Sequence, residues 1–293
     1  ANYNLTERMN VFMNMGYLSI APKFRSVYER ETNELFSNIE NERVKAVEIG
    51  YNYHSGRFTS NINAYYTIWE NKPHPYGKRI QLIDDFGDPY EVIANINGMD
   101  ALHKGIEIDF VYKVRSNVYW EGLASIADWV WNSSDTVRLY DDYQNFIGTE
   151  YFDAKGVHVG NAAQIQLATS LRWEPIEKMY FKGQLTHFSK YYSDFDPFSL
   201  DGSPQSLDED GNPRQSWRIP NYYLVDIHAG YGIFLNENLK LSFRISVLNA
   251  LDKMYISDAQ NNSTYNDFGT NGFDANSADV FFGLGRRWST SLQ

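Results

Sequence analysis

The sequence contains no cysteine, which excludes disulfide frameworks and thiolate metal sites. It has no apolar run of about 18 residues and therefore no transmembrane helix. Residues 1–10 are polar and lack the apolar core of a signal peptide. Basic residues are few, because 26 Lys and Arg stand against 37 Asp and Glu, a formal net charge of −11. This balance argues against a nucleic-acid partner, whose phosphates require clustered Lys and Arg.

Aromatic residues, by contrast, are abundant. The chain has 22 Tyr, 18 Phe and 7 Trp, yet its mean hydropathy is only −0.50. A soluble domain this aromatic would normally carry a larger aliphatic core. A transmembrane β-barrel accounts for both numbers, because its strands alternate apolar and polar residues while girdles of aromatic residues line its two rims.

The dominant pattern along the chain has a period of two. Across residues 239–247 every odd position is apolar and every even position is Lys, Ser or Arg. Such strands have one dry and one wet face, which fits a half-buried antiparallel sheet or a membrane barrel. Strand length separates the two, because globular strands run to about 5–6 residues and tilted membrane strands need about 9–11. Several segments here exceed the globular length.

The connections between the predicted strands alternate in length. We predict roughly ten strands, at residues 9–19, 43–54, 57–70, 101–115, 117–131, 161–174, 178–192, 219–234, 238–250 and 278–292. Short connections lie at 54–57, 114–117, 174–178 and 235–238, and long ones at 20–42, 71–100, 132–160, 193–218 and 251–278. Outer-membrane barrels have short periplasmic turns and longer extracellular loops. The sequence therefore predicts an all-β fold, an antiparallel transmembrane β-barrel.

Two of the long loops carry turn clusters of their own, at Asp84–Pro89 and Asp208–Pro213. The first cluster separates two apolar stretches, which predicts a hairpin. In the second, Asp208, Asp210 and Asn212 have oxygen-ligand spacing that loosely resembles a calcium loop, but the Glu at its twelfth position is absent. A turn is the stronger interpretation.

The sequence offers little for catalysis. Its 6 histidines are scattered and form neither an HExxH motif nor a paired metal spacing. No nucleophile elbow, P-loop or dinucleotide-binding turn is present. We predict a protein that is not an enzyme, with no catalytic residue, no metal site and no cofactor.

Charged residues recur on the polar side of the predicted strands. In a barrel they point inward, because a charge on the lipid face costs about 2–4 kcal/mol at the membrane midplane. A solvated lumen wall with mutual ion pairs is the first interpretation, and a path for substrate is the second. The lumen-facing charged residues that we predict are Glu48, Glu107, Asp109, Glu121, Arg172, Lys182, Asp226, Lys240 and Arg244.

Large aromatic residues stand at the ends of predicted strands and in the long loops. Girdle anchoring or loop packing is the first interpretation, and stacking on a ligand is the second, because aromatic side chains offer rigid contact area. The ligand-binding candidates are Trp69, Tyr143, Tyr151, Tyr191, Tyr192, Trp217 and Tyr265.

Several stretches, in order, resemble the barrel of TonB-dependent receptors. Residues 16–22 end a strand on Ala-Pro, and residues 41–51 carry a Glu-(apolar)-Gly pattern. Residues 104–110 are similar to a Gly-(apolar)-Glu strand. Residues 219–226 and 247–255 resemble the Pro-x-Tyr…Asp and Asn-(apolar)-(apolar)-Asp-(basic)-x-Tyr signatures near the end of such barrels.

The resemblance implies an outer-membrane transporter that binds an extracellular nutrient and imports it with energy delivered by TonB. The nutrient classes are siderophore, metal chelate, vitamin, peptide and glycan. Family barrels have about 22 strands and a plugged lumen. Residues 1–293 are then one domain, about half of such a barrel, and the plug and the first half lie outside this sequence.

The implied partners are outer-membrane lipid and TonB, which acts through the plug, with a surface lipoprotein as a further candidate. Residues 64–72 resemble receptors of Bacteroidota.

Two other functions stay open. A passive porin-like channel would need no energy, and a plug upstream in the sequence would decide against it. A soluble all-β carbohydrate-binding protein would stack sugars on its aromatic residues. It predicts solubility without detergent and short, irregularly connected strands.

Overall fold

In a computed structural model the chain is an all-β protein with one large and two small sheets. The structure describes residues 1–23, 27–28, 35, 39–72, 79–83, 86–94, 98–143, 145–204, 206–236, 239–261, 275 and 278–293. Within these residues, no helix has the length and apolar character that crossing a membrane requires.

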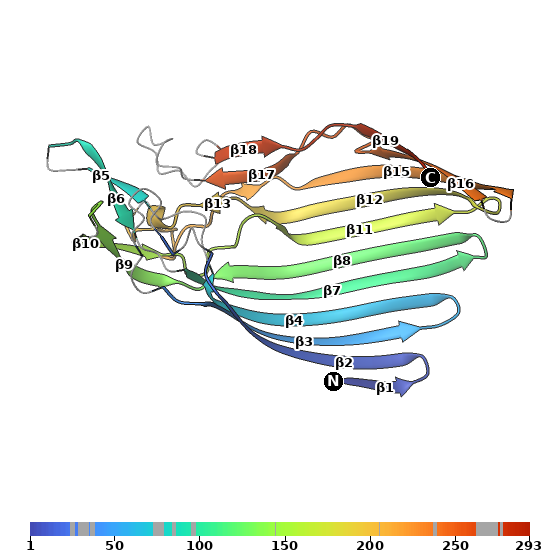
Figure 1. Cartoon of the computed structure of the whole chain (residues 1–293), viewed down its shortest axis with the longest axis horizontal. Helices are drawn as coiled ribbons and strands as arrows, with labels where there is room; N and C mark the ends of the chain where they lie inside the picture. Colours follow the sequence, from blue (N-terminus) through green and yellow to red (C-terminus); the bar gives the residue numbers. More distant parts are fainter. Residues whose placement is uncertain are drawn as a thin grey trace.

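The large sheet is curved and antiparallel (Figure 1). Its strands are β1 (Asn2–Thr6), β2 (Met9–Ile20), β3 (Glu42–His54), β4 (Phe58–Lys72), β7 (Met99–Arg115), β8 (Val118–Trp131), β11 (Ala163–Trp173), β12 (Met179–Tyr192), β14 (Arg218–Ile219), β15 (Tyr222–Asn236), β16 (Leu239–Leu248) and β19 (Arg287–Leu292). The pairing order is β1-β2-β3-β4-β7-β8-β11-β12-β15-β16-β19, and β14 pairs with β12 off this path. The predicted antiparallel sheet of long strands is confirmed.

The short connections gather at one end of the large sheet and the long loops at the other (Figure 1). We call these the short-turn end and the loop end. β4 has 15 residues and β7 has 17, well above the length of a globular strand. The predicted alternation of short and long connections is therefore confirmed, because consecutive long strands run in opposite directions between the two ends.

Two details of the predicted strands were wrong. The expected strand at 278–292 is split into β18 (Ala278–Phe282) and β19, which pair with different strands. The Tyr255 ring lies over Gly283 in the break, where an added Cβ would sit 2.0 Å from it. The second detail is β1, which pairs with β2 but escaped prediction because it has only 5 residues.

The long loops fold into small sheets rather than irregular structure. A four-stranded sheet has the order β10-β9-β6-β5, and a three-stranded sheet the order β13-β17-β18. The bounds are β5 (Arg79–Ile83), β6 (Pro89–Ala94), β9 (Ser134–Tyr140), β10 (Phe146–Asp153), β13 (Asp194–Phe195) and β17 (Ile256–Asn261), with a short 3-10 helix η2 (Pro197–Ser199). The pairing of β5 with β6 confirms the hairpin predicted around 84–89.

The second turn cluster is also a turn. Leu207 bridges to Pro213, and the Asp208 carboxylate accepts hydrogen bonds from the backbone N–H of Asp210 (3.0 Å) and Asn212 (2.9 Å). One Asp208 oxygen is thus engaged in closing the loop, which supports the turn interpretation.

The buried core lies at the loop end. Its fully buried residues include Val92, Phe152, Phe195 and Leu200, contributed by β6, β10, β13 and the segment after η2. They pack the loop sheets against the ends of β7 and β8, where Met99 and Trp131 are also buried. The hydrophobic effect therefore stabilises a cap of loops at the loop end rather than a layer behind the large sheet.

The register of the large sheet sorts its side chains onto two faces. On the apolar face large hydrophobic side chains are exposed along every long strand between β4 and β16. They include Ile62, Ile106, Ile126, Leu167, Leu185, Ile227 and Phe243. Soluble monomers rarely expose a contiguous apolar surface of this extent.

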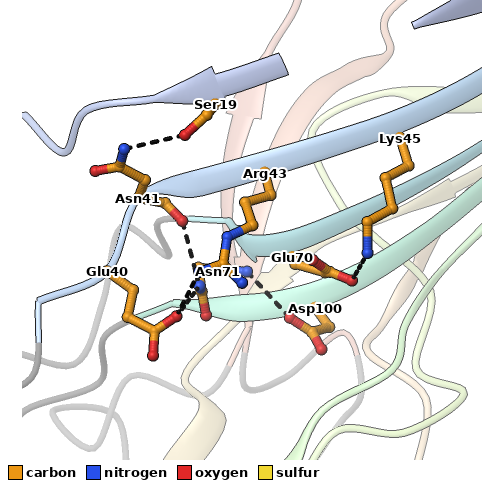
Figure 2. A network of polar contacts seen from close by, with 8 residues as sticks. All are labelled: Ser19, Glu40, Asn41, Arg43, Lys45, Glu70, Asn71 and Asp100. Atoms are coloured by element: carbon orange, nitrogen blue, oxygen red, sulfur yellow. Dashed lines mark hydrogen bonds and ion pairs between the residues drawn. The ribbon is translucent and has the colours of Figure 1, made fainter. Parts of the chain in front are cut away.

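Charged pairs interrupt the apolar face towards the loop end. Lys45 pairs with Glu70, and Lys104 lies 3.0 Å from Asp128. Figure 2 shows the first pair beside a network that ties the ends of β2, β3, β4 and β7 together. In it the Asn71 side chain donates to Glu40 (3.1 Å), and its backbone N–H donates to the Asp100 carboxylate (3.0 Å). These contacts fix where the long loops leave the sheet.

Candidate functional site

The second face of the large sheet, which we call the polar wall, carries the charged residues that the sequence singled out. Register places all nine of them on this face: Glu48, Glu107, Asp109, Glu121, Arg172, Lys182, Asp226, Lys240 and Arg244. A single face follows from the alternation of side chains along each strand, because directly paired residues point the same way. That this face lines a lumen stays a prediction.

The polar wall contains a compact ion-pair network. Lys182 Nζ lies 2.6 Å from Glu121 Oε2, which also accepts a hydrogen bond from the Ser170 hydroxyl at 2.8 Å. Towards the short-turn end, Arg172 Nε donates to Glu174 Oε1 at 2.8 Å. An ion pair thus joins β8 to β12, and the Ser170 hydroxyl ties β11 to the same carboxylate.

On β2, β3, β4 and β7, asparagine side chains donate hydrogen bonds to carboxylates of the polar wall. Asn14 donates to Glu48 at 3.0 Å, and Asn63 donates to the same carboxylate at 2.5 Å. Asn61 donates to both oxygens of Asp109, at 2.8 and 3.1 Å. Within the described residues, amides rather than cations therefore hold these two carboxylates.

An aromatic cluster with one cation occupies the loop end of the polar wall. The His103 ring stacks on Trp129 with centroids 5.3 Å apart and meets Trp69 edge-on at 5.7 Å. Lys72 Nζ lies 4.4 Å from the Trp69 ring centroid, within cation–π range. Within the described chain, Trp69 Nε1 and His103 Nε2 are buried without a hydrogen-bond partner. Buried polar groups normally have a partner, so these two nitrogens mark the cluster as unusual.

Sequence reasoning found Trp69 but missed His103, Trp129 and Lys72. A signal was present, since Trp69, His103 and Trp129 stand on the polar side of three strands, close to where long loops begin. Recognising the group required the register that places Trp69 opposite Ala101 and His103 opposite Trp129.

The other predicted aromatic residues do not join this cluster. Tyr143 is 86% exposed, and Tyr151 lies in β10 with its hydroxyl 2.9 Å from Ser134 Oγ. The Tyr192 ring stacks on His158, with centroids 4.2 Å apart. Each of these residues contacts a different part of the loop end.

Tyr191 and Trp217 belong to a second buried cluster, and the Tyr191 hydroxyl donates to the Ser257 carbonyl at 2.8 Å. Tyr265 lies outside the described residues. Loop packing therefore describes most of this set, and Trp69 is the member whose surroundings suit a ligand. Within the described residues, no group of three or more His, Asp and Glu side chains is arranged to hold a metal.

Two buried carboxylates sit beneath the cap. Burial raises the pKa of Asp194 above its usual range, Asp258 adds to this, and Asn161 and Lys72 partly oppose it. Burial likewise raises the pKa of Asp196, against a hydrogen bond from the backbone of Phe198. An acid whose pKa is higher in the folded state holds its proton more tightly when folded, so this part of the structure gains stability as pH falls through the folded value.

We expect hydrogen exchange around Asp194, corrected for intrinsic rates, to slow from pH 7.5 to pH 5. Asp194→Asn should slow exchange at pH 7.5 and flatten its pH dependence, because the amide carries no charge to desolvate. Asp201→Asn is the matched control, because the pKa of Asp201 is shifted in the opposite direction from that of Asp194. Burial acts to raise the pKa of Asp201, but hydrogen bonds from Ser203 outweigh it and lower the pKa. Faster exchange in Asp194→Asn at pH 7.5 would contradict the assignment.

Comparison with known proteins gives one family and many structures. A family model described as "TonB dependent receptor-like, beta-barrel" matches residues 1–250. The copper transporter OprC is similar in structure, with a TM-score of 0.60, 11% identity, and coverage of 99% of this chain and 38% of that one. The ferric citrate transporter FecA, unliganded, has a TM-score of 0.60, 16% identity, and coverage of 99% and 36%.

The siderophore receptor PiuA from Acinetobacter baumannii has a TM-score of 0.59, 14% identity, and coverage of 99% and 34%. At these identities the likeness concerns the fold. The chain spans about a third of the length of these structures. No curated protein sequence matches it.

Proposed function

This chain belongs to the TonB dependent receptor-like β-barrel family, and from this we propose that it is part of an outer-membrane transporter that binds an extracellular nutrient and imports it with energy supplied through TonB. The observation that supports this most is the division of the large sheet into an exposed apolar face and a charged polar wall. An apolar band facing lipid and a polar interior are what a transmembrane barrel needs.

The ligand enters the proposal as a nutrient of the siderophore, metal-chelate, vitamin, peptide or glycan class. Trp69, His103, Trp129 and Lys72 are the proposed contacts from this segment, because they combine ring faces, a cation and two buried nitrogens without a hydrogen-bond partner. Outer-membrane lipid contacts the apolar face, and TonB acts through a plug elsewhere in the full-length protein. A surface lipoprotein and an origin in Bacteroidota complete the proposal.

The first test asks whether the full-length protein is a membrane barrel. We expect it to be extracted from membranes only with detergent and to migrate faster on gels before boiling than after. Its intact mass should be well above the 34.0 kDa of this chain. A water-soluble protein of about this mass, with no mobility shift, would overturn the transporter and favour a soluble β-protein.

The second test separates energised from passive transport. A plugged receptor reconstituted in a planar bilayer should show no steady conductance, because the plug fills the lumen. A passive porin-like channel conducts in salt alone. Stable open-channel currents from the intact full-length protein would contradict the TonB-dependent mechanism, even if the barrel itself were confirmed by its mobility shift.

A further inference from the structure

A small cationic pocket lies on the polar wall near the short-turn end, between β11, β12, β15 and β16. Its volume is about 240 Å³. Four cationic side chains and one carboxylate, Glu174, line it. The cations are Arg172, Lys178, Lys240 and Arg244.

Two glycines of β15 line the pocket. A Cβ at Gly230 would sit 2.3 Å from the Tyr180 ring, which lies flat against the strand. A Cβ at Gly232 would sit 3.2 Å from Lys240 Cε and 3.6 Å from Lys178 Cβ. A side chain at Gly232 would enter the space beside Lys240 and Lys178, and one at Gly230 would displace the Tyr180 ring, so the shape of the pocket depends on both glycines.

The nearby carboxylates are already engaged. Glu174 is bound to Arg172 at 2.8 Å, and Lys178 pairs with Glu177 at 3.3 Å. Asp226, further up β15 on the same wall, accepts a hydrogen bond from the backbone N–H of Asn249 at 2.8 Å.

Glu121 is likewise paired with Lys182. In the part of the chain that the structure describes, Lys240 and Arg244 have no carboxylate partner. Register places Arg244 directly opposite Gly230 and Lys240 opposite Phe234, so the two side chains flank the pocket.

We propose that this pocket is an anion-binding site that takes a carboxylate or phosphate group. Arg244 offers a planar fork of donors that matches two oxygens, and Lys240 adds a point charge. The Ser242 side chain lies between them on the same face of β16. The group can come from a soluble anionic solute or from an Asp or Glu side chain of another segment of the full-length protein. The proposal that this pocket binds an anion is argued from its lining residues alone. Only the statement that the pocket faces a barrel lumen rests on the proposed function.

The test uses the full-length protein in detergent, with citrate and inorganic phosphate as probes in titration calorimetry. If the pocket is open to solutes, at least one probe binds, and Lys240→Gln/Arg244→Gln weakens binding tenfold or more. Gly232→Val, which keeps every charge but fills the pocket, weakens it as well. Lys113→Gln/Arg115→Gln removes the same charges at the same end of the sheet and leaves binding unchanged. Equal losses in the two double variants indicate a general counterion effect and overturn the proposal.

A second experiment tests whether a carboxylate of the protein itself occupies the pocket. If a carboxylate of another segment fills the pocket, neither probe binds, and carbodiimide treatment joins Lys240 to an Asp or Glu from outside residues 1–293, as peptide mass spectrometry would show. Absence of both probe binding and this cross-link overturns the proposal. The faster migration of each unboiled variant shows that it is folded. Loss of anion binding in a folded variant is thereby distinguished from failure of the proposed barrel.

Discussion

Asn249→Ala is expected to lower the free energy of unfolding by about 2–4 kcal/mol. Asn249 is 2% exposed and follows β16 with φ 49°, a left-handed conformation that Asn tolerates better than Ala. Its side chain donates to the carbonyls of Lys253 (2.9 Å) and Leu284 (3.3 Å) and accepts from the Lys253 N–H (2.8 Å). Alanine removes the side-chain partner of these three backbone groups and places a residue without αL preference at a positive φ. The measurement is the temperature at which the full-length protein loses its fast-migrating form.

Two further variants sharpen this result. Asn249→Asp keeps the acceptor for Lys253 N–H but loses both donated hydrogen bonds, so its loss should be intermediate if the donors matter. Asn221→Ala removes an exposed side chain whose one described hydrogen bond is a long contact of 3.5 Å from Arg218. It should leave the transition unchanged. Equal effects of Asn249→Ala and Asn221→Ala would refute a structural role for Asn249 in the 247–255 motif.

Gly160→Ala is expected to loosen the cap at the loop end. A Cβ at Gly160 would sit 2.8 Å from the backbone nitrogen of Asp194 and from the backbone oxygen of Ser193. Backbone atoms cannot swing aside as a flexible side chain does, so the segment containing β13 must move. An overpacking cost of about 1–2 kcal/mol raises the opening of this segment roughly 5–30-fold. Hydrogen exchange of peptides around Ser193–Phe195 measures that opening.

The matched control is Gly148→Ala in β10, where a Cβ meets nothing within 4 Å. It changes the same atoms in another part of the loop end and should leave exchange at Ser193–Phe195 unchanged. If both variants speed exchange equally, glycine-to-alanine substitution in the loops has a general effect and the close approach at Gly160 is not its cause. Neither substitution lies in the polar wall, so the mobility shift of the barrel should persist in both.

The sequence by itself determined the large sheet, its two faces and the two kinds of connection. These features are local, because alternation along a strand decides which side chains face which way, and turn length decides where the chain reverses. All nine charged residues chosen from the alternation, from Glu48 to Arg244, fall on one face for this reason. The motif at 247–255 was also visible, although only the structure shows that Asn249 uses it to close a turn against Lys253 and Leu284.

Only the tertiary structure decided what happens at the loop end. The grouping of Trp69 with His103, Trp129 and Lys72 depends on strand register and on loops that pack over them, and neither leaves a periodic trace in the sequence. The break between β18 and β19 depends on their pairing with different strands, β17 and β16. The cationic pocket likewise required β12, β15 and β16 side by side. Contacts of this kind are set by packing between distant segments, which residue patterns along one strand do not encode.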